Sequence, residues 1–310
     1  MQATFCELES AGLIAFTGED ATSFLHAQLT SDVAGLAMPR TQYSGYCSPK
    51  GRLLAACLLW RRETDLLLQL PGHLRESLQA RLAKYVLRAR VSVVDASTRY
   101  ALFGIAGNGA SGAISHLGLV PPGAPHDVVS IDGVDITRLP GERYLMAVPV
   151  GEVRRVSASL RDHARQHDES LWSCLDIEAG IPVIVQGTQD QYVPQMVNLD
   201  LIGGVSYTKG CYPGQEIVAR THHLGRLKQR MYRIRLPMLD PVPPGEPLFS
   251  PQFGNEQASG AILYAARSEA GAHEALAVVQ IASAGGGDVR VTSPEGPKVE
   301  FLPLPYALPS

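Results

Sequence analysis

Residues 207–216 read YTKGCYPGQE, and IVART follows at 217–221. A cysteine in a protein core normally has apolar neighbours. Cys211 instead stands in a turn-forming sequence, between Lys209 and a helix start that the pattern predicts at Gln215. A nearby cation, converging glycine N–H groups and the positive end of a helix all favour the thiolate, which is the reactive form of cysteine. The stretch therefore predicts a reactive cysteine.

The alternative is that the two glycines only form turns and that Cys211 packs inward. A lysine, two glycines and a Gln-Glu pair within one octapeptide favour the functional interpretation over this structural one. The motif consists of Lys209, Gly210, Cys211, Tyr212, Gly214, Gln215 and Glu216.

The composition is that of an ordinary globular protein: 310 residues, 45% hydrophobic and 18% charged. This length is enough for about two domains. The net charge of −3 lacks the excess of positive charge that is typical of nucleic-acid-binding proteins. The longest apolar run, residues 53–60, is far shorter than the about 20 residues that span a bilayer, and residues 1–10 lack a signal-peptide pattern. We therefore expect a cytoplasmic protein with neither a nucleic-acid nor a membrane partner.

The cysteine count is odd and no CxxC pair occurs, which argues against a disulfide framework or a zinc ribbon. His163 and His167 are four residues apart, but their polar surroundings are typical of a solvated helix surface, so we expect no metal site. Cys57 stands in an apolar run and is predicted to be buried and inert. The cysteines are Cys6, Cys47, Cys57, Cys174 and Cys211.

A strand–strand–helix–strand–strand order is predicted between residues 53 and 105. It implies an antiparallel α+β layer with its helices on one face. The expected elements are strands at Leu53–Trp60 and Leu66–Leu70, a helix at about His73–Leu87, and strands at Val91–Val94 and Tyr100–Ile105.

Five further elements follow from local patterns. The run Gly12–Phe16 is typical of a strand, and TGED at Thr17–Asp20 predicts a helix start capped by Thr17. Asp132-Gly133 is a hairpin signal. Helices are expected at Val153–Ala164 and Leu171–Ala179.

The segment Pro237–Pro247 contains five prolines, which exclude a helix or a central strand. Short β-prone pieces separated by glycine-rich turns follow it and are typical of a small β-barrel. We therefore divide the chain into a core at 1–236 and a barrel at 237–310. The β-prone pieces are Gly260–Ala265, Ala275–Ile281, Asp288–Thr292 and Lys298–Leu302.

Two charged features have an open interpretation. Glu178 ends a predicted helix, where a carboxylate is unfavourable for the helix dipole, so a ligand role and an exposed helix end are equally supported. Residues 217–236 contain six basic side chains and no acidic one. Such a run is either a solvated strand face or a site for an anionic ligand tail.

Several motifs together resemble the YgfZ-type tetrahydrofolate-binding proteins of iron–sulfur cluster assembly and repair. The resemblance covers essentially the whole chain, and its wider superfamily includes the glycine-cleavage aminomethyltransferase, the T-protein. It implies an α+β fold with two intertwined α/β lobes, antiparallel sheets around a folate pocket, a middle lobe at roughly 40–110 and a C-terminal β-barrel. The motifs are KGCYPGQE (209–216), IEAGIP (177–182), VPQMVNLD (193–200), LTSDV (29–33), YCSPKGRLLA (46–55) and FLPLPYAL (301–308).

The resemblance also implies a site and its ligands. The cofactor would be tetrahydrofolate or a derivative, and the partners would be iron–sulfur client enzymes or cluster-assembly factors. A carboxylate accepts the paired N–H groups of a pterin, and cations suit glutamyl carboxylates. Cys211 with Lys209 forms the expected catalytic centre, and the expected cofactor contacts are Glu178, Gln195, Lys209, Tyr212 and Arg220.

One departure from the superfamily concerns catalysis. Ala55 and Ala56 stand where the T-protein has its acidic residue, which argues against aminomethyl transfer. A folate-dependent one-carbon transferase is therefore the alternative function. A binding module with a structural Cys211 and a thiol oxidoreductase rank lower, the latter because no resolving cysteine lies nearby. Cys211 remains open as nucleophile, metal ligand or redox sensor.

Overall fold

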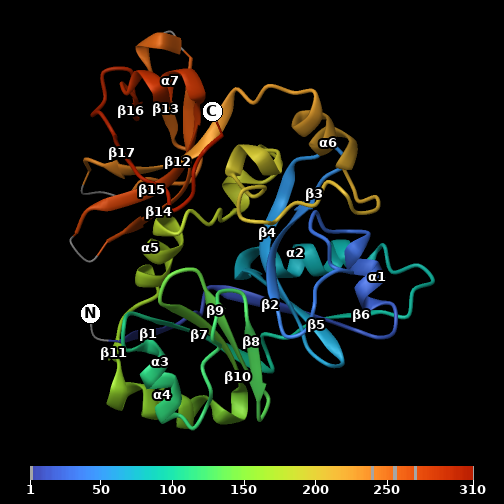
Figure 1. The fold of residues 1–310 in the computed structure, drawn as a ribbon. Coiled ribbons are helices and arrows are strands. Elements are labelled where there is room, and N and C mark those ends of the chain that lie inside the picture. Colours follow the sequence, from blue (N-terminus) through green and yellow to red (C-terminus); the bar gives the residue numbers. More distant parts are fainter. Residues whose placement is uncertain (1–2, 239–240, 254–256, 269–270, 310) are drawn as a thin grey trace. The chain divides into compact units, whose positions relative to one another are not determined.

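A computed structural model describes residues 3–309, apart from 239–240, 254–256 and 269–270 (Figure 1). The chain forms two compact units, and each gathers segments from distant parts of the sequence. The α+β fold class with antiparallel sheets is confirmed. Unit 1 comprises Met1–Gln28, Asp32–Tyr43 and Cys57–Trp172, and unit 2 comprises Leu29–Ser31, Ser44–Ala56 and Ser173–Ser310.

Unit 1 contains a six-stranded sheet in the order β11-β1-β7-β10-β9-β8. Its buried apolar side chains pack with those of the helices α3 (Ala110–His116) and α4 (Val153–His163) in one core. The hairpin signal is confirmed, because Asp132 and Gly133 both have positive φ and join paired strands. The strands are β1 (Thr4–Glu7), β7 (Tyr100–Ala106), β8 (Val128–Ile131), β9 (Val134–Leu139), β10 (Arg143–Pro149) and β11 (Arg165–Gln166).

A second sheet has the order β3-β4-β5-β2-β6, and α2 (Gly72–Ala83) packs on it. Both β3 and β4 have one part in each unit. The expected strands here are confirmed, whereas α2 ends four residues before the predicted Leu87. The strands are β2 (Ala11–Thr17), β3 (Thr41–Cys47), β4 (Leu53–Arg61), β5 (Asp65–Pro71) and β6 (Ser92–Asp95).

Two expectations for unit 1 are wrong. The strands β6 and β7 do not share a sheet: β6 pairs with β2, and β7 lies between β1 and β10. Periodicity shows which side chains are buried, but it does not show which strand is the neighbour. Thr17 also caps no helix, because it continues the β2 ladder opposite Asp65, and α1 begins only at Ala21 (Ala21–His26).

Unit 2 contains a curled six-stranded sheet in the order β16-β13-β14-β15-β12-β17, drawn in orange to red in Figure 1. Its aliphatic core agrees with the expected small β structure. β12 lies before Pro237 in the sequence and pairs with β15 and β17 of this sheet. The boundary between a core at 1–236 and a barrel at 237–310 stays a prediction. The elements are β12 (Gln229–Leu236), β13 (Pro247–Phe249), β14 (Gly260–Arg267), β15 (His273–Gln280), α7 (Ile281–Gly286), β16 (Arg290–Val291) and β17 (Glu300–Leu302).

Two helices complete unit 2: α5 (Ser170–Glu178), which begins in unit 1 and ends at Glu178 as expected, and α6 (Gln215–His223). In the proline-rich segment, residues 239–240 lie outside the described residues. The described remainder forms no helix, and β13 begins at Pro247. Among the described residues, no helix is long and apolar enough to cross a bilayer.

Candidate functional site

The octapeptide turn leads directly into α6, which begins at Gln215 as predicted. Gly214 precedes it with φ of 78°. A Cβ at Gly214 would lie 2.4 Å from the carbonyl oxygen of Ser48 and 2.5 Å from the nitrogen of Gly51. Only glycine therefore fits here, because the left-handed backbone and the close approach both exclude a side chain. The turn is consequently seated on the loop at residues 48–51.

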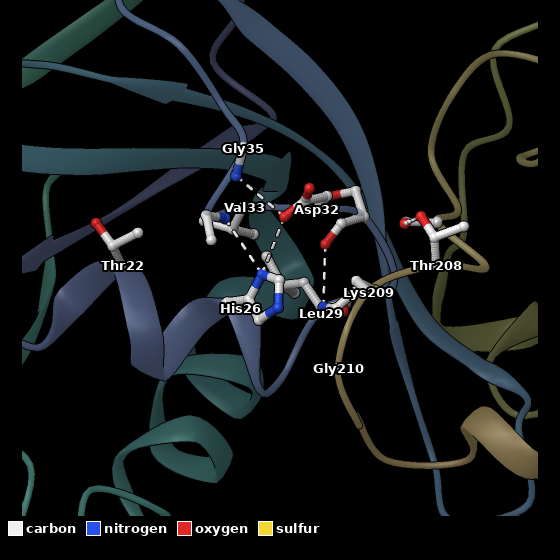
Figure 2. Close-up of polar contacts among 12 residues, drawn as sticks. Thr22, His26, Leu29, Asp32, Val33, Gly35, Thr208, Lys209 and Gly210 are labelled. Carbon is white, nitrogen blue, oxygen red and sulfur yellow. Dashed lines mark hydrogen bonds and ion pairs between the residues drawn. The ribbon is translucent and has the colours of Figure 1, made fainter.

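Lys209 fastens the other end of the turn. Its Nζ donates hydrogen bonds to the carbonyl oxygens of Leu29 at 2.6 Å and Ser31 at 3.1 Å (Figure 2). The same ammonium lies 5.1 Å from the ring centroid of Tyr212, within the range of a cation–π contact. Tyr212 is buried, and this burial raises the pKa of its hydroxyl. The lysine thus positions the turn through backbone carbonyls and a buried ring.

Cys211 lies on the exposed side of this turn. Of the five cysteines, all in the described part of the chain, only Cys211 is exposed. The amide of Gln215 approaches the carbonyl oxygens of Lys209 at 3.5 Å and Gly210 at 3.4 Å, so the backbone before the cysteine is supported from within the turn. The Cys211 thiol is therefore exposed to solvent, and the backbone that carries it is supported by contacts within the turn.

The other cysteines are buried, as expected for Cys57. Burial raises the pKa of both Cys6 and Cys57 to about 12. Burial also raises the pKa of Cys47, and the carboxylate of Asp190 adds to this effect. A thiol with a raised pKa remains protonated at neutral pH, where only the thiolate reacts. These thiols are therefore both inaccessible and un-ionised in the folded protein.

We predict that iodoacetamide at neutral pH labels only Cys211 in the folded protein. The reason is the contrast between one exposed thiol and four buried ones. Peptide mass spectrometry after a short reaction measures the label at each cysteine, and labelling in urea provides the control in which all five react. Labelling of Cys47 or Cys57 at a rate comparable to Cys211 would contradict the prediction.

A buried polar network lies beneath α6. Arg230 donates from Nη1 to the side-chain oxygen of Asn198 at 3.0 Å and to the carbonyl oxygen of Gln195 at 3.3 Å. The same nitrogen lies 3.6 Å from a carboxylate oxygen of Asp200. Burial raises the pKa of Asp200, and the Arg230 guanidinium opposes that shift. Asn198 also donates to the carbonyl oxygen of Met231 at 2.9 Å, so the network joins residues 195–200 to β12.

This network connects further motifs. Gln195 donates from Nε2 to the carbonyl oxygen of Val218 in α6 at 2.7 Å. Tyr306 donates to the carbonyl oxygen of Gly180 at 2.7 Å, and Asn198 Nδ2 lies 3.5 Å from the Tyr306 hydroxyl. Segments that are far apart in the sequence thus meet inside unit 2. Sequence reasoning missed Asn198, Asp200, Arg230 and Tyr306 as a group, although three of them stand within the quoted motifs.

The remaining predicted residues lie apart from the turn. Glu178 is half-exposed at the end of α5, and its carboxylate is 3.6 Å from Nη2 of Arg233 on β12. Arg220 is exposed on α6, whereas Gln195 is buried below that helix. The structure therefore brings Lys209, Cys211 and Tyr212 together in one turn and leaves the other three around α6 and β12. Among the described residues, no cluster of three or more His, Cys, Asp or Glu side chains could hold a metal ion.

Comparison with solved structures defines the class of fold. The chain matches the crystal structure of the glycine cleavage system aminomethyltransferase T from Bartonella henselae with a TM-score of 0.77. The match covers 96% of this chain and 84% of that chain, at 19% sequence identity. The protein therefore has the aminomethyltransferase T fold.

Sequence comparison then gives the family, although no family model matches. The tRNA-modifying protein YgfZ of Klebsiella pneumoniae (strain 342) is 30% identical over 307 residues, which is 98% of this chain and 93% of that protein. The proteins of the same name from Sodalis glossinidius (strain morsitans) and Yersinia pestis (strain Pestoides F) are 29% identical with the same coverage. The chain belongs to the YgfZ family.

Proposed function

We propose that this chain is a tetrahydrofolate-binding accessory protein for iron–sulfur cluster assembly or repair, and that it acts through Cys211. The observation that carries the proposal is the exposed Cys211 thiol on the octapeptide turn, in contrast to the other four cysteines, which are buried. Lys209 and Gly214 fasten that turn at both ends, which is the support that a reacting side chain requires. Assay of iron–sulfur enzyme activity in a deletion strain that carries variants of this chain tests the proposal.

The residues fit a folate by the chemistry of their side chains. Glu178 has a side chain that is 51% exposed, and its distance of 3.6 Å from Arg233 is longer than a hydrogen bond. Its carboxylate is therefore available to the adjacent N–H groups of a pterin. The exposed Arg220 suits a glutamyl carboxylate. Tetrahydrofolate, when bound, would supply a reduced pterin that carries one-carbon units.

We predict that Glu178→Gln weakens tetrahydrofolate binding by roughly 1.5–3 kcal/mol, because it replaces a charged acceptor by a neutral amide. Isothermal calorimetry measures the affinity. Glu300→Gln is the matched control, since Glu300 is also a half-exposed partner of an arginine on β12. Unchanged affinity in Glu178→Gln, or an equal loss in both variants, would remove Glu178 from the folate site.

The role of the thiol is limited by its neighbours. An iron–sulfur cluster takes about four thiolate ligands. Among the described residues no group of His, Cys, Asp and Glu could complete such a set around Cys211. If Cys211 ligates iron, a partner must therefore supply the remaining ligands. As a nucleophile or a redox group, Cys211 would instead act alone on that partner.

The name of the relatives is compatible with this proposal. An accessory protein that maintains an iron–sulfur enzyme acting on tRNA would influence tRNA modification without binding RNA itself. The net charge of −3 agrees with such an indirect role, because direct binding to RNA relies on excess positive charge.

The alternative is a folate-dependent one-carbon transferase. Its support is the fold shared with an aminomethyltransferase, but fold alone does not establish an activity. Ala55 and Ala56 are buried in β4, and neither offers a carboxylate for proton transfer. Methylenetetrahydrofolate should therefore form only at the background rate when the protein is mixed with an aminomethylated lipoyl carrier. Catalytic turnover in that assay would favour the transferase.

A further inference from the structure

The helix α6 has an exposed side with aliphatic residues. Ile217 lies in the first turn of α6 and is 39% exposed. Leu224, two turns further on, directly follows the last residue of the helix and is 85% exposed. Arg220 lies between them along the sequence and is exposed as well. The polar neighbour His222 instead stacks on the Tyr207 ring, with 3.7 Å between the ring centroids. The aliphatic side chain of Leu224 is therefore available for an apolar contact with a partner.

The stretch of sequence that contains these aliphatic residues also carries positive charge. Of the six basic residues at 217–236, three are neutralised within unit 2: Arg230 by Asp200, Arg233 by Glu274, and Arg235 by Glu274 and Glu300. The other three are Arg220, Arg226 and Lys228, and they are exposed without an acidic partner among the described residues. Tertiary pairing therefore leaves the unneutralised charge beside Leu224.

A second segment adds to this surface. A Cβ at Gly51 would lie 2.8 Å from the Cβ of Ile217, so the loop at 48–52 contacts the first turn of α6. Its exposed residues include Lys50 and Arg52. Glu216 is an exposed acid of α6, and Asp190, which accepts a hydrogen bond from Ser48 at 2.6 Å, is exposed next to the loop. We call this the α6 surface, which consists of Lys50, Arg52, Ile217, Arg220, Leu224, Arg226 and Lys228.

We propose that the α6 surface docks a protein partner whose own face is acidic and contains an apolar pocket for Leu224. Charge complementarity selects an acidic partner, and the aliphatic side chains select a protein over a nucleic acid, because phosphates offer them no apolar contact. Two aliphatic residues are too few for the apolar face of a membrane-bound helix. Because the turn that carries Cys211 leads into α6, docking there brings the partner to the thiol. The inference goes beyond the proposed function and does not require folate.

The chain offers a matched control surface at the end of α2. Leu87 is also 85% exposed, and Arg81, Lys84 and Arg88 around it are exposed without an acidic partner among the described residues. This α2 surface has the charge and the leucine of the α6 surface but no exposed cysteine. Variants of the α2 surface therefore test whether a partner binds specifically to the α6 surface or is attracted to any basic patch.

The probe is a fluorescein-labelled 20-residue peptide with glutamate and leucine at helical spacing, measured by anisotropy with the full chain. The α6 variants are the triple R220E/R226E/K228E and the single Leu224→Ser. The α2 controls are the triple R81E/K84E/R88E and Leu87→Ser. We expect the α6 triple to weaken peptide binding by about tenfold or more, because several charge pairs are reversed at once, and the α2 triple to change it by less than about twofold.

A second readout locates the bound peptide. Saturating peptide should slow the alkylation of Cys211 by iodoacetamide in the wild-type protein, and the α6 triple should remove this protection, measured in each variant as the ratio of its alkylation rates with and without peptide. Equal losses from the α6 and α2 triples, or binding without protection, would overturn the proposal. Tighter binding of a 20-nucleotide oligouridylate or of phosphatidylglycerol vesicles than of the peptide would overturn it in favour of those partners. Neither folate nor an iron–sulfur enzyme enters this test, so its result is independent of the proposed function.

Discussion

Replacing Cys211 with serine is expected to abolish the rescue of iron–sulfur enzyme activity in a deletion strain. Cys211 is exposed, so the substitution removes no packed side chain, and the fold and folate affinity should remain. Serine keeps the size of cysteine, but its hydroxyl does not ionise near neutral pH and is a poor ligand for soft metals. Activity of an iron–sulfur enzyme in cell extracts, normalised to the amount of variant protein, measures the effect.

The control for this substitution is Cys57→Ala, which removes a buried thiol on β4 instead of the exposed one. It should retain rescue, because the buried thiol is not accessible to a partner protein or a metal ion. Full rescue by Cys211→Ser would show that the exposed thiol has no role in the cell. Loss of rescue in both variants, with normal protein levels, would also exclude a specific role for Cys211.

Arg230→Ala is expected to lower the free energy of unfolding by about 3–5 kcal/mol, because it breaks a buried charge pair and leaves the other charge without compensation. Arg230 and Asn198 are buried, and Asp200 is nearly so. Without the guanidinium, the Asn198 oxygen loses its donor and the Asp200 carboxylate loses its cation. Urea denaturation followed by circular dichroism measures the change.

Arg235→Ala provides the matched control on the same strand. Its side chain is 43% exposed, and it pairs with the exposed Glu300 at 2.8 Å and with Glu274 at 3.5 Å. Glu274 keeps its closer ion pair with Arg233 at 2.6 Å in this variant. An exposed ion pair contributes less than about 1 kcal/mol, so this variant should remain close to the wild type. Similar losses in the two arginine variants would show that the buried network does not distinguish Arg230 from a surface arginine.

Local patterns were sufficient where neighbouring residues decide the structure. Asp132-Gly133 forms the expected hairpin because its two positive φ angles are a property of the turn itself. The helix that starts within the octapeptide begins at Gln215 because Gly214 supplies the left-handed residue before it. The polar surroundings of Cys211 and the apolar surroundings of Cys57 likewise predicted which thiol is exposed and which is buried.

Pairing between distant segments is what the local sequence could not decide. The strands β6 and β7 follow one another in the chain but belong to different sheets. β6 pairs with β2, whereas β7 pairs with both β1 and β10. The arginines and lysine at 217–236 look alike in sequence. Only the fold brings Asp200, Glu274 and Glu300 to three of them, and it leaves Arg220, Arg226 and Lys228 exposed. The sequence by itself thus determined the octapeptide turn and the helix that follows from it, and tertiary structure decided which charges are structural, because neutralisation depends on distance in space.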